Sequence, residues 1–473
     1  MPRTRLGIDF GTSQIKAIRV STSGQTKSIE TIPMPTKTEE SRITHPPETL
    51  LKRIKDIPDR FDLTGPWDAA IASQRSTFIL WHAERGNILT PLISWRDRRG
   101  AQWIQNLSSD QFDKIQDVTG LRPEAGYPLS KLRWILEDNE KIRNWAEDGL
   151  VNYGSLDTWL TWVASNGNFN GMVPTQASRT LLFDPVEQQW SRDLMQEFDI
   201  PPALFPDIVD EFPDAIPADG LWENARIVSL IGDQPAATIG GQPPPYEQTR
   251  VTLGTAGFVS EAASPDDCPD RLTLGFTPTK TGQIYQSEGV VLSAGRAVDW
   301  LIRVLGINYE TFEQWLKPPW PEDIPLWCSS FNGVGAPFWQ DREATLDFLN
   351  ESTSTKQICL GLAASILLRV KDIIDYLPEN SQRRLLVDGG LTSIDYLPTI
   401  AASIWDLPTA RTLTPHLTCR GALIASHWRS NYFSGDPWEN LNAEIVIPNS
   451  DLPSQRWQNE WKDGLRQWNL TTD

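Results

Sequence analysis

A glycine turn that follows a short apolar run near the start of the chain has the residue types of a phosphate site. Leu6-Gly7-Ile8 leads into Asp9-Phe10-Gly11-Thr12-Ser13, and Lys16 follows. Glycine has no Cβ, so a phosphate can approach the backbone N–H groups closely, and Thr12 and Ser13 add hydroxyl donors. Asp9 could hold Mg²⁺ through water. The chemistry indicated is nucleotide binding, and an ordinary hairpin turn is the alternative.

A second candidate is an aspartate between an apolar strand and a helix start. Gly232-Asp233-Gln234 follows Leu230-Ile231 and precedes Ala236-Ala237. A carboxylate in this place can accept the proton of a hydroxyl group, which phosphoryl transfer to an alcohol requires. A helix N-cap aspartate is the structural alternative. Asp233 is therefore a candidate general base.

Two further glycine turns lie in the second half of the chain. Gly254-Thr255 follows the apolar run Val251–Leu253 and repeats the pattern of the first turn. This repeat predicts an internally duplicated architecture with a cleft between the halves. Gly389-Gly390 follows Leu385–Asp388 and could admit a flat base or a phosphate. A tight left-handed turn explains it equally well.

Two segments between these turns could contact a hydroxylated substrate. Arg75 could bind vicinal hydroxyls with its planar fork, and Trp95 could stack on a carbon skeleton. Surface salt bridges and core packing are the alternatives. Asp9-Phe10-Gly11 matches the protein-kinase metal motif, but no H-R-D loop precedes it, and no P-loop or G-x-G-x-x-G fingerprint follows a strand.

Composition narrows the class of protein. A chain of 473 residues should form more than one domain. The net charge of −18 argues against nucleic acid and anionic membranes as partners. No apolar run is long enough to span a bilayer and the polar start is no signal peptide, so we expect a cytoplasmic protein. The four cysteines and four histidines are widely spaced, which disfavours a zinc site or a disulfide framework.

The strands and helices that must position these residues give an α/β class. Residues 5–30 predict strand, turn and strand, and 385–387 predict a further strand. Apolar periodicity predicts helices over 129–146, 155–165 and 355–377, the last capped by Thr353 or Ser354. The stripe Trp457, Trp461, Leu465 and Trp468 predicts a closing helix, and the Pro-rich stretch 241–245 a crossover between domains.

Together and in this order, the segments resemble the FGGY family of carbohydrate kinases, with Gly126–Ile135 as the most specific stretch. The resemblance implies two duplicated ribonuclease-H-like domains of the actin/hexokinase type with an inter-domain cleft. Residues 1–242 would bind the substrate and carry the base, and residues 243–473 would bind ATP. ATP and Mg²⁺ would be the cofactors, a small polyol or sugar the substrate, and a homodimer is an open option.

The resemblance, which is strongest to the glycerol kinases of the family, also implies residue roles. Asp233 would be the base and Asp9 the metal residue. The remaining positions would be Arg75, Ser76, Trp95, Tyr127, Asp233, Gln234 and Phe258 for the substrate, and Gly11, Thr12, Ser13, Lys16, Gly254, Thr255, Gly295, Gly389 and Gly390 for ATP.

Some positions depart from that pattern. Ser76 stands where glycerol kinases carry a glutamate, Ile394 and Asp395 replace an asparagine pair, and residues 346–353 lack a glycine. Loss of the glutamate removes hydrogen bonds of about 1.5–3 kcal/mol each. The substrate therefore stays open between a polyol and a pentulose such as xylulose or ribulose. A non-catalytic sugar or nucleotide sensor on the same fold is a further alternative. The stretch Gly126–Ile135 disfavours an actin- or chaperone-like ATPase.

Overall fold

The computed structural model describes residues 3–328, 331, 333–340, 342–439, 441–470 and 472. The chain forms two compact units. Unit 1 comprises Met1–Pro244, Gly275–Ile284 and Pro415–Asn440, and unit 2 comprises Pro245–Leu274, Tyr285–Thr414 and Leu441–Asp473. The first break, between Pro244 and Pro245, lies within the Pro-rich stretch that predicted a crossover. Two later segments return to unit 1, which a single boundary between residues 242 and 243 does not describe.

Unit 1 is built on a six-stranded mixed sheet with the order β14-β15-β6-β1-β2-β3. β1 pairs antiparallel with β2 and parallel with β6, and β6 pairs parallel with β15. The strands are β1 (Thr4–Phe10), β2 (Gln14–Val20), β3 (Thr26–Pro33), β6 (Trp67–Ser73), β14 (Ile216–Pro217) and β15 (Ala225–Gly232). Leu6, Ile8 and Phe10 are fully buried, which anchors the strand that precedes the glycine turn.

A seven-stranded sheet with the order β18-β19-β17-β16-β22-β23-β24 repeats this plan. It belongs to unit 2 except for Gly275–Ile284, which covers most of β18 and the start of β19 and is assigned to unit 1. β16 pairs antiparallel with β17 and parallel with β22, β22 pairs parallel with β23, and β23 pairs antiparallel with β24. The strands are β16 (Thr249–Leu253), β17 (Gly257–Ala262), β18 (Thr273–Thr279), β19 (Gly282–Val291), β22 (Leu385–Asp388), β23 (Thr409–Thr412) and β24 (Ala443–Val446). The two hairpins thus open two sheets of the same topology, as the repeat predicted.

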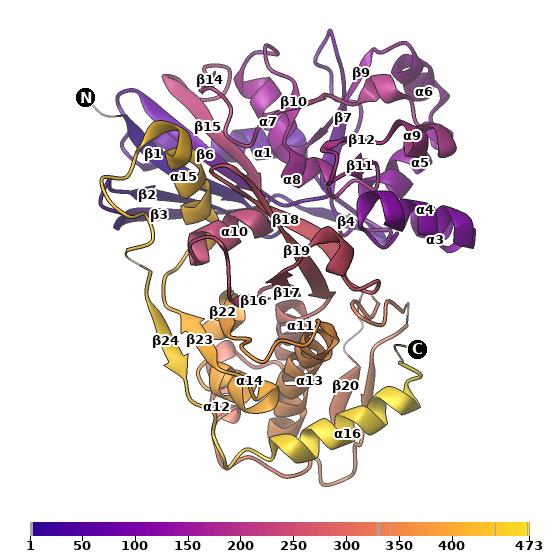
Figure 1. Ribbon diagram of the computed structural model, residues 1–473, viewed down its shortest axis with the longest axis vertical. Helices are drawn as coiled ribbons and strands as arrows, with labels where there is room; N and C mark the ends of the chain where they lie inside the picture. Colours follow the sequence, from indigo (N-terminus) through magenta and orange to yellow (C-terminus); the bar gives the residue numbers. More distant parts are fainter. Residues whose placement is uncertain are drawn as a thin grey trace. The chain divides into compact units, whose positions relative to one another are not determined.

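Two helices pack on each other in unit 1 although they are far apart in sequence. α15 (Leu417–Ser430) lies against β1, β6 and β15 and crosses α10 (Asp233–Gly241), as Figure 1 shows. The crossing is so close that a Cβ on Gly421 would lie 1.7 Å from the carbonyl oxygen of Ala236, and one on Gly240 2.0 Å from that of Leu417. Only glycine fits at these two positions. α15 is therefore an integral layer of the unit that carries Asp9 and Asp233.

A five-stranded sheet with the order β4-β5-β8-β7-β9 and several helices complete unit 1. The predicted helix over 129–146 is two helices, because Asn139 leaves the helical conformation and its side chain caps the next helix by accepting from the N–H of Ile142. The further elements include β4 (Lys37–Glu39), β5 (Arg42–His45), β7 (Phe78–His82), β8 (Leu92–Ile93), β9 (Val151–Ser155), α1 (Pro47–Ile54), α4 (Ser109–Thr119), α5 (Pro128–Asp138), α6 (Glu140–Glu147), α7 (Leu156–Ala164), α8 (Pro174–Ala177) and α9 (Arg192–Glu197).

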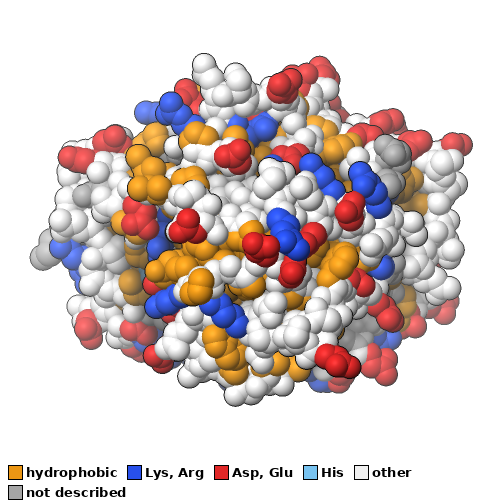
Figure 2. Space-filling model, turned by 90° about the horizontal axis from the view of Figure 1, so that it is seen from below, with side chains coloured by type: hydrophobic (Ala, Val, Ile, Leu, Met, Phe, Trp, Pro, Cys, Tyr) orange, Lys and Arg blue, Asp and Glu red, His pale blue; other side chains and the backbone are white. Residues whose placement is uncertain are grey.

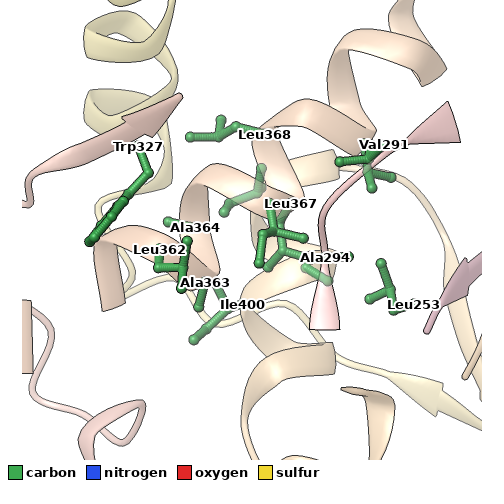
Figure 3. Close-up of a cluster of buried hydrophobic side chains, with 14 of the residues drawn as sticks. Leu253, Val291, Ala294, Trp327, Leu362, Ala363, Ala364, Leu367, Leu368 and Ile400 are labelled. Carbon is green, nitrogen blue, oxygen red and sulfur yellow. The ribbon is translucent and has the colours of Figure 1, made fainter. Parts of the chain in front are cut away.

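The core of unit 2 surrounds α13 (Thr355–Tyr376), which confirms the helix predicted over 355–377. Ser354 caps it in a capping box with Gln357. Figure 3 shows Leu362, Ala364 and Leu367 of α13 among apolar side chains from neighbouring elements, including Leu253 and Ile400. The other helices of the unit are α11 (Gly295–Leu305), α12 (Tyr309–Trp315), α14 (Leu397–Trp405) and the closing helix α16 (Ser454–Gln467). Trp457, Trp461 and Trp468 are buried, as the aromatic stripe predicted.

The face drawn in Figure 2 mixes hydrophobic, acidic and basic side chains. On the face drawn in Figure 2, acidic side chains are spread widely, and lysine and arginine side chains lie singly or in small groups between them. Within the part of the chain that the structure describes, no helix combines the length and the apolar character needed to cross a bilayer.

Candidate functional site

The carboxyl ends of three parallel strands bring the unit 1 candidates to one edge of the sheet. Phe10 at the end of β1 lies opposite Ser73 at the end of β6, and Ser73 lies opposite Gly232 at the end of β15. The glycine turn, the segment with Arg75, and Asp233 follow these three strand ends. In open α/β sheets this edge is where ligands bind.

Asp9 lies at this edge with one carboxylate oxygen that lacks a hydrogen-bond partner. Its Oδ1 is buried and makes no hydrogen bond, and Lys16 lies opposite it in the β1–β2 register. Burial and the nearby charge of Asp233 raise the pKa of Asp9 to about 7, while Lys16 opposes the rise. An unsatisfied buried carboxylate oxygen is a place where a cation would relieve the electrostatic penalty.

The residues around Asp9 fit a Mg²⁺ ion that a bound nucleotide helps to coordinate. In the described part of the chain, no group of three or more His, Cys, Asp or Glu side chains could hold a metal. Mg²⁺ commonly binds through one or two carboxylates while waters and substrate phosphates complete its octahedron. Asp9 supplies such a carboxylate, so the donor set fits a metal that arrives with a nucleotide and not a fully protein-bound ion.

The turn after Asp9 is fixed by a chain of hydrogen bonds from the interior. The N–H of Gly11 donates to the carbonyl of Gln14 at 3.1 Å, and Nε2 of Gln74 donates to the carbonyl of Gly11 at 3.5 Å. Gln74 Nε2 also lies 3.4 Å from Nε2 of His45, whose Nδ1 lies 2.9 Å from the carbonyl of Pro35. Burial lowers the pKa of His45 to about 4, so the ring is neutral, donating at Nδ1 and accepting at Nε2.

Asp233 is the first residue of α10, not its cap. Gly232 is the N-cap residue, and the carboxylate of Asp233 accepts from the N–H of Gln234 at 2.8 Å. Nε of Arg75 lies 3.5 Å from Oδ1 of Asp233, whose side chain is 26% exposed. A Cβ on Gly232 would lie 2.9 Å from Cδ of Arg75, so this glycine makes room for the arginine. The carboxylate is thus both held and accessible.

Two buried residues support the backbone before Asp233. The N–H of Gly232 donates to Oγ1 of Thr175 at 3.0 Å, and the N–H of Thr175 donates to Oε1 of Glu211 at 3.1 Å. Burial raises the pKa of Glu211 to about 8, so its carboxyl group is mostly protonated at neutral pH. A neutral carboxyl group can support this backbone without a buried charge.

Trp95, one of the substrate candidates, is hydrogen-bonded to the glycine turn after Asp9. Its indole Nε1 donates to Oγ1 of Thr12 at 3.0 Å, and its backbone N–H donates to Oγ1 of Thr77 at 3.2 Å. Asp97, two residues later, is fully buried and accepts from the N–H of Ile43 at 2.8 Å and from the guanidinium of Arg99. The loop that presents Trp95 is therefore fixed from both sides.

The stretch Gly126–Ile135 holds the same loop. Lys131 on α5 is fully buried, and its Nζ donates to the carbonyls of Ser94 at 3.0 Å and Gly126 at 2.7 Å. Burial lowers the pKa of Lys131 to about 7, against the opposing effect of Asp97. Tyr127, half-buried, is the N-cap residue of α5 directly after Gly126. The most specific stretch of the sequence thus ties α5 to the Trp95 loop.

Two other substrate candidates lie beside Arg75 and Asp233 in sequence. Ser76 has a left-handed backbone, with φ of 60°, and its hydroxyl donates to the carbonyl of Arg179 at 3.0 Å. Gln234 is half-buried in the first turn of α10. These two residues belong to unit 1, as do Arg75, Trp95, Tyr127 and Asp233, whereas Phe258 lies on β17 in unit 2 opposite Thr252.

The nucleotide candidates of unit 2 form one backbone cluster. The N–H of Gly295 donates to the carbonyl of Gly254 at 2.8 Å, and the N–H of Ala294 donates to that of Thr255 at 3.1 Å. Gly389 has a φ of 102°, and a Cβ there would lie 2.5 Å from the carbonyl oxygen of Leu253. The neighbouring Gly390 is exposed with open space around it. Residues from three segments that are far apart in sequence therefore meet at the ends of β16 and β22.

Sequence reasoning missed the residues that support the site from behind. His45, Thr175 and Glu211 had no local motif, because each acts through a partner far away in the chain. Lys131 was part of the stretch Gly126–Ile135, and an isolated lysine between buried positions of a helix was a usable signal that it points inward to a specific acceptor.

Models of one protein family match both halves of the chain. Residues 4–240 match the N-terminal domain of the FGGY family of carbohydrate kinases, and residues 250–429 match its C-terminal domain. The glycerol kinase of Aromatoleum aromaticum is 29% identical over 465 residues, which cover 90% of this chain and 92% of that protein.

Solved structures share the fold over nearly the whole chain. A ligand-bound xylulose kinase from Lactobacillus acidophilus has a TM-score of 0.85 at 16% identity and covers 100% of this chain and 99% of its own. The glycerol kinase of Plasmodium falciparum with ADP has a TM-score of 0.81 at 20% identity and covers 98% of each chain. With both halves matched in order and the duplicated sheet topology present, the chain belongs to the FGGY family of carbohydrate kinases and has its actin/hexokinase-like fold.

Proposed function

We propose that the protein transfers the terminal phosphoryl group of ATP to a hydroxyl of a small polyol or sugar, with Asp233 as the general base. The observation that carries the proposal is the common edge of β1, β6 and β15. There a phosphate-type turn, an arginine and an accessible carboxylate follow three aligned strand ends. A phosphoryl transfer to an alcohol needs these three functions in one place.

Asp233 would orient the acceptor hydroxyl and take its proton as the new P–O bond forms. Nε of Arg75 lies 3.5 Å from Oδ1 of Asp233 and helps to orient this carboxylate. In a loose transition state the proton leaves late, so positioning contributes more than basicity.

Each unit carries candidate contacts for ATP. The Gly11–Ser13 turn in unit 1 and the Gly254–Thr255 turn in unit 2 each combine hydroxyl donors with glycine backbone that phosphate oxygens can approach closely. The cluster of Gly295, Gly389 and Gly390 would receive the adenosine. Asp9 would hold Mg²⁺, which supplies charge neutralisation between the phosphates. This division assigns the base and most acceptor contacts to unit 1, with Phe258 contributed by unit 2.

The acceptor is proposed from the residues and the named activities of relatives. The glycerol kinase and xylulose kinase that resemble the chain act on a polyol and a ketopentose, as their names state. At position 76 the serine hydroxyl is already donated to Arg179 and offers no charged acceptor for two substrate hydroxyls. Similarity to a glycerol kinase makes glycerol the first acceptor to test, and the serine at position 76 keeps xylulose or ribulose as the alternative.

The test is a coupled ADP-release screen over glycerol, erythritol, xylulose and ribulose with Mg²⁺ and ATP. Asp233→Asn should lower kcat by about 10²–10⁴-fold because it removes the proton acceptor, with ATP affinity nearly unchanged. Asp193→Asn, an exposed aspartate in the first turn of α9, is the matched control and should retain full activity. Full activity of Asp233→Asn would refute the base assignment. ADP release that no acceptor accelerates would refute the kinase proposal.

A further inference from the structure

The hydrogen bond between Trp95 and Thr12 joins a residue proposed to contact the acceptor with one proposed to contact ATP. Nε1 of Trp95 lies 3.0 Å from Oγ1 of Thr12. An indole N–H only donates, so the threonine oxygen must accept, and its hydroxyl hydrogen must point elsewhere. Among the described residues, the Thr12 hydroxyl has no other hydrogen-bond partner. The indole therefore turns Thr12 into a donor with a defined direction.

Both partners are fixed before any ligand binds. Thr12 lies in a turn closed by the Gly11–Gln14 hydrogen bond, and Trp95 is held by its backbone bond to Thr77. The carbonyl of Ser94, next to Trp95, accepts from the buried Lys131. A donor that is already oriented loses little conformational entropy when a ligand arrives.

We propose that Trp95 is a positioning residue for the nucleotide as well as an acceptor contact: its N–H directs the Thr12 hydroxyl toward a phosphate oxygen of ATP. This inference rests on the proposed function. The arrangement couples the two ligands, because an acceptor that packs on the indole ring restrains the same group that orients Thr12. By thermodynamic linkage, the acceptor must then tighten the nucleotide by the factor by which the nucleotide tightens the acceptor.

The experiment is a calorimetric titration of the full chain with adenylyl imidodiphosphate and Mg²⁺, alone and with a saturating acceptor from the screen. Trp95→Phe keeps an aromatic ring but removes the N–H, so nucleotide binding without acceptor should weaken roughly two- to tenfold, the range for one hydrogen bond. Thr12→Val should weaken it at least as much, since it also removes the donor to phosphate. In the Thr12→Val background, Trp95→Phe should have no further effect, because both changes remove one interaction.

Trp190→Phe is the matched control. Trp190 is also half-buried in unit 1 and donates its indole N–H to the carbonyl of Pro206 at 2.9 Å, so this variant loses an equivalent bond away from the site. It should bind the nucleotide analogue like the wild type. If Trp95→Phe proves unstable, Thr12→Ser and Thr12→Val give the same test: the serine keeps the hydroxyl and the coupling with acceptor, and the valine loses both.

The outcomes separate the two proposals. A wild-type chain that binds the analogue no more tightly than Trp95→Phe overturns this inference and leaves the proposed function standing. Additive losses in the double variant also overturn it, as does a coupling factor that survives in Thr12→Val. A wild-type chain that binds no nucleotide analogue refutes the proposed function itself, and this inference with it.

Discussion

At the scale of single residues, the site contains carboxylates whose placement opposes folding. Asp9 is held among strands with one oxygen lacking a partner, and burial together with the charge of Asp233 raises its pKa to about 7. In the unfolded chain an aspartate titrates near 3.9. Between these two values the folded protein keeps a proton that the unfolded chain has lost. The free energy of unfolding therefore falls as pH rises from about 4 to about 7.

Asp9→Asn should remove that pH-dependent penalty. We expect the variant without ligands to unfold at a higher temperature than the wild type at pH 8, with a gain of about 1–3 kcal/mol that shrinks toward zero as pH approaches 4. Thermal unfolding followed by circular dichroism at several pH values measures this difference. A gain that stays constant with pH would show that Asp9 is not ionised against a penalty in the folded state.

At the scale of elements, Gly240 and Gly421 allow α10 and α15 to cross closely. The crossing of α10 and α15 leaves no space for a Cβ at Gly421, and the same α10 has Asp233 as its first residue. A side chain at the crossing would have to push the helices apart or shift one along the other. Either movement would also shift Asp233, because Asp233 lies less than three helical turns from the crossing in the same helix.

Gly421→Ala should therefore destabilise the protein by about 1–3 kcal/mol or more and also lower kcat, because α10 moves with its first residue. Thermal unfolding and steady-state ADP release measure the two effects. Gly65→Ala is the control, since a Cβ there meets nothing within 4 Å, and it should change neither quantity. Equal stability of the two variants would contradict the close crossing.

The features that the sequence predicted are local ones, and those that it missed depend on distant residues. The sequence predicted features that local rules determine: the two hairpins, the strand before Asp388, and the helix that Ser354 caps. It missed the break at Asn139, where an apolar stripe continued across a residue that prefers to cap a helix. His45 and Glu211 could not be predicted, because their roles come from burial and from partners far away in the chain.

At the scale of the whole molecule, the two units are not consecutive halves of the chain. Unit 1 needs Pro415–Asn440, because α15 covers β1, β6 and β15 and packs on α10. The N-terminal family match ends at residue 240 and lacks this helix. A domain boundary drawn only from the sequence match therefore leaves one face of the central sheet uncovered.

A fragment of residues 1–244 should lack a cooperative thermal transition and bind a hydrophobic dye, since it loses the helix that covers Gly7 and exposes buried apolar side chains on the same face, such as Ile18 and Ala70. Joining residues 410–440 to this fragment through a flexible linker should restore cooperative unfolding. Circular dichroism and dye fluorescence of both fragments test this. A cooperative transition in the shorter fragment would contradict an integral role for α15.

In the proposed acceptor site, the backbone at Ser76 limits which residues can replace this serine. Its φ of 60° is readily adopted by glycine, asparagine and aspartate, but it is strained for β-branched and long side chains. Most single-nucleotide or designed substitutions at this position would add backbone strain, which opposes the gain from any improved substrate contact. Directed evolution toward a new acceptor should therefore recover small polar residues at position 76, with larger changes appearing only after neighbouring substitutions have relaxed the turn.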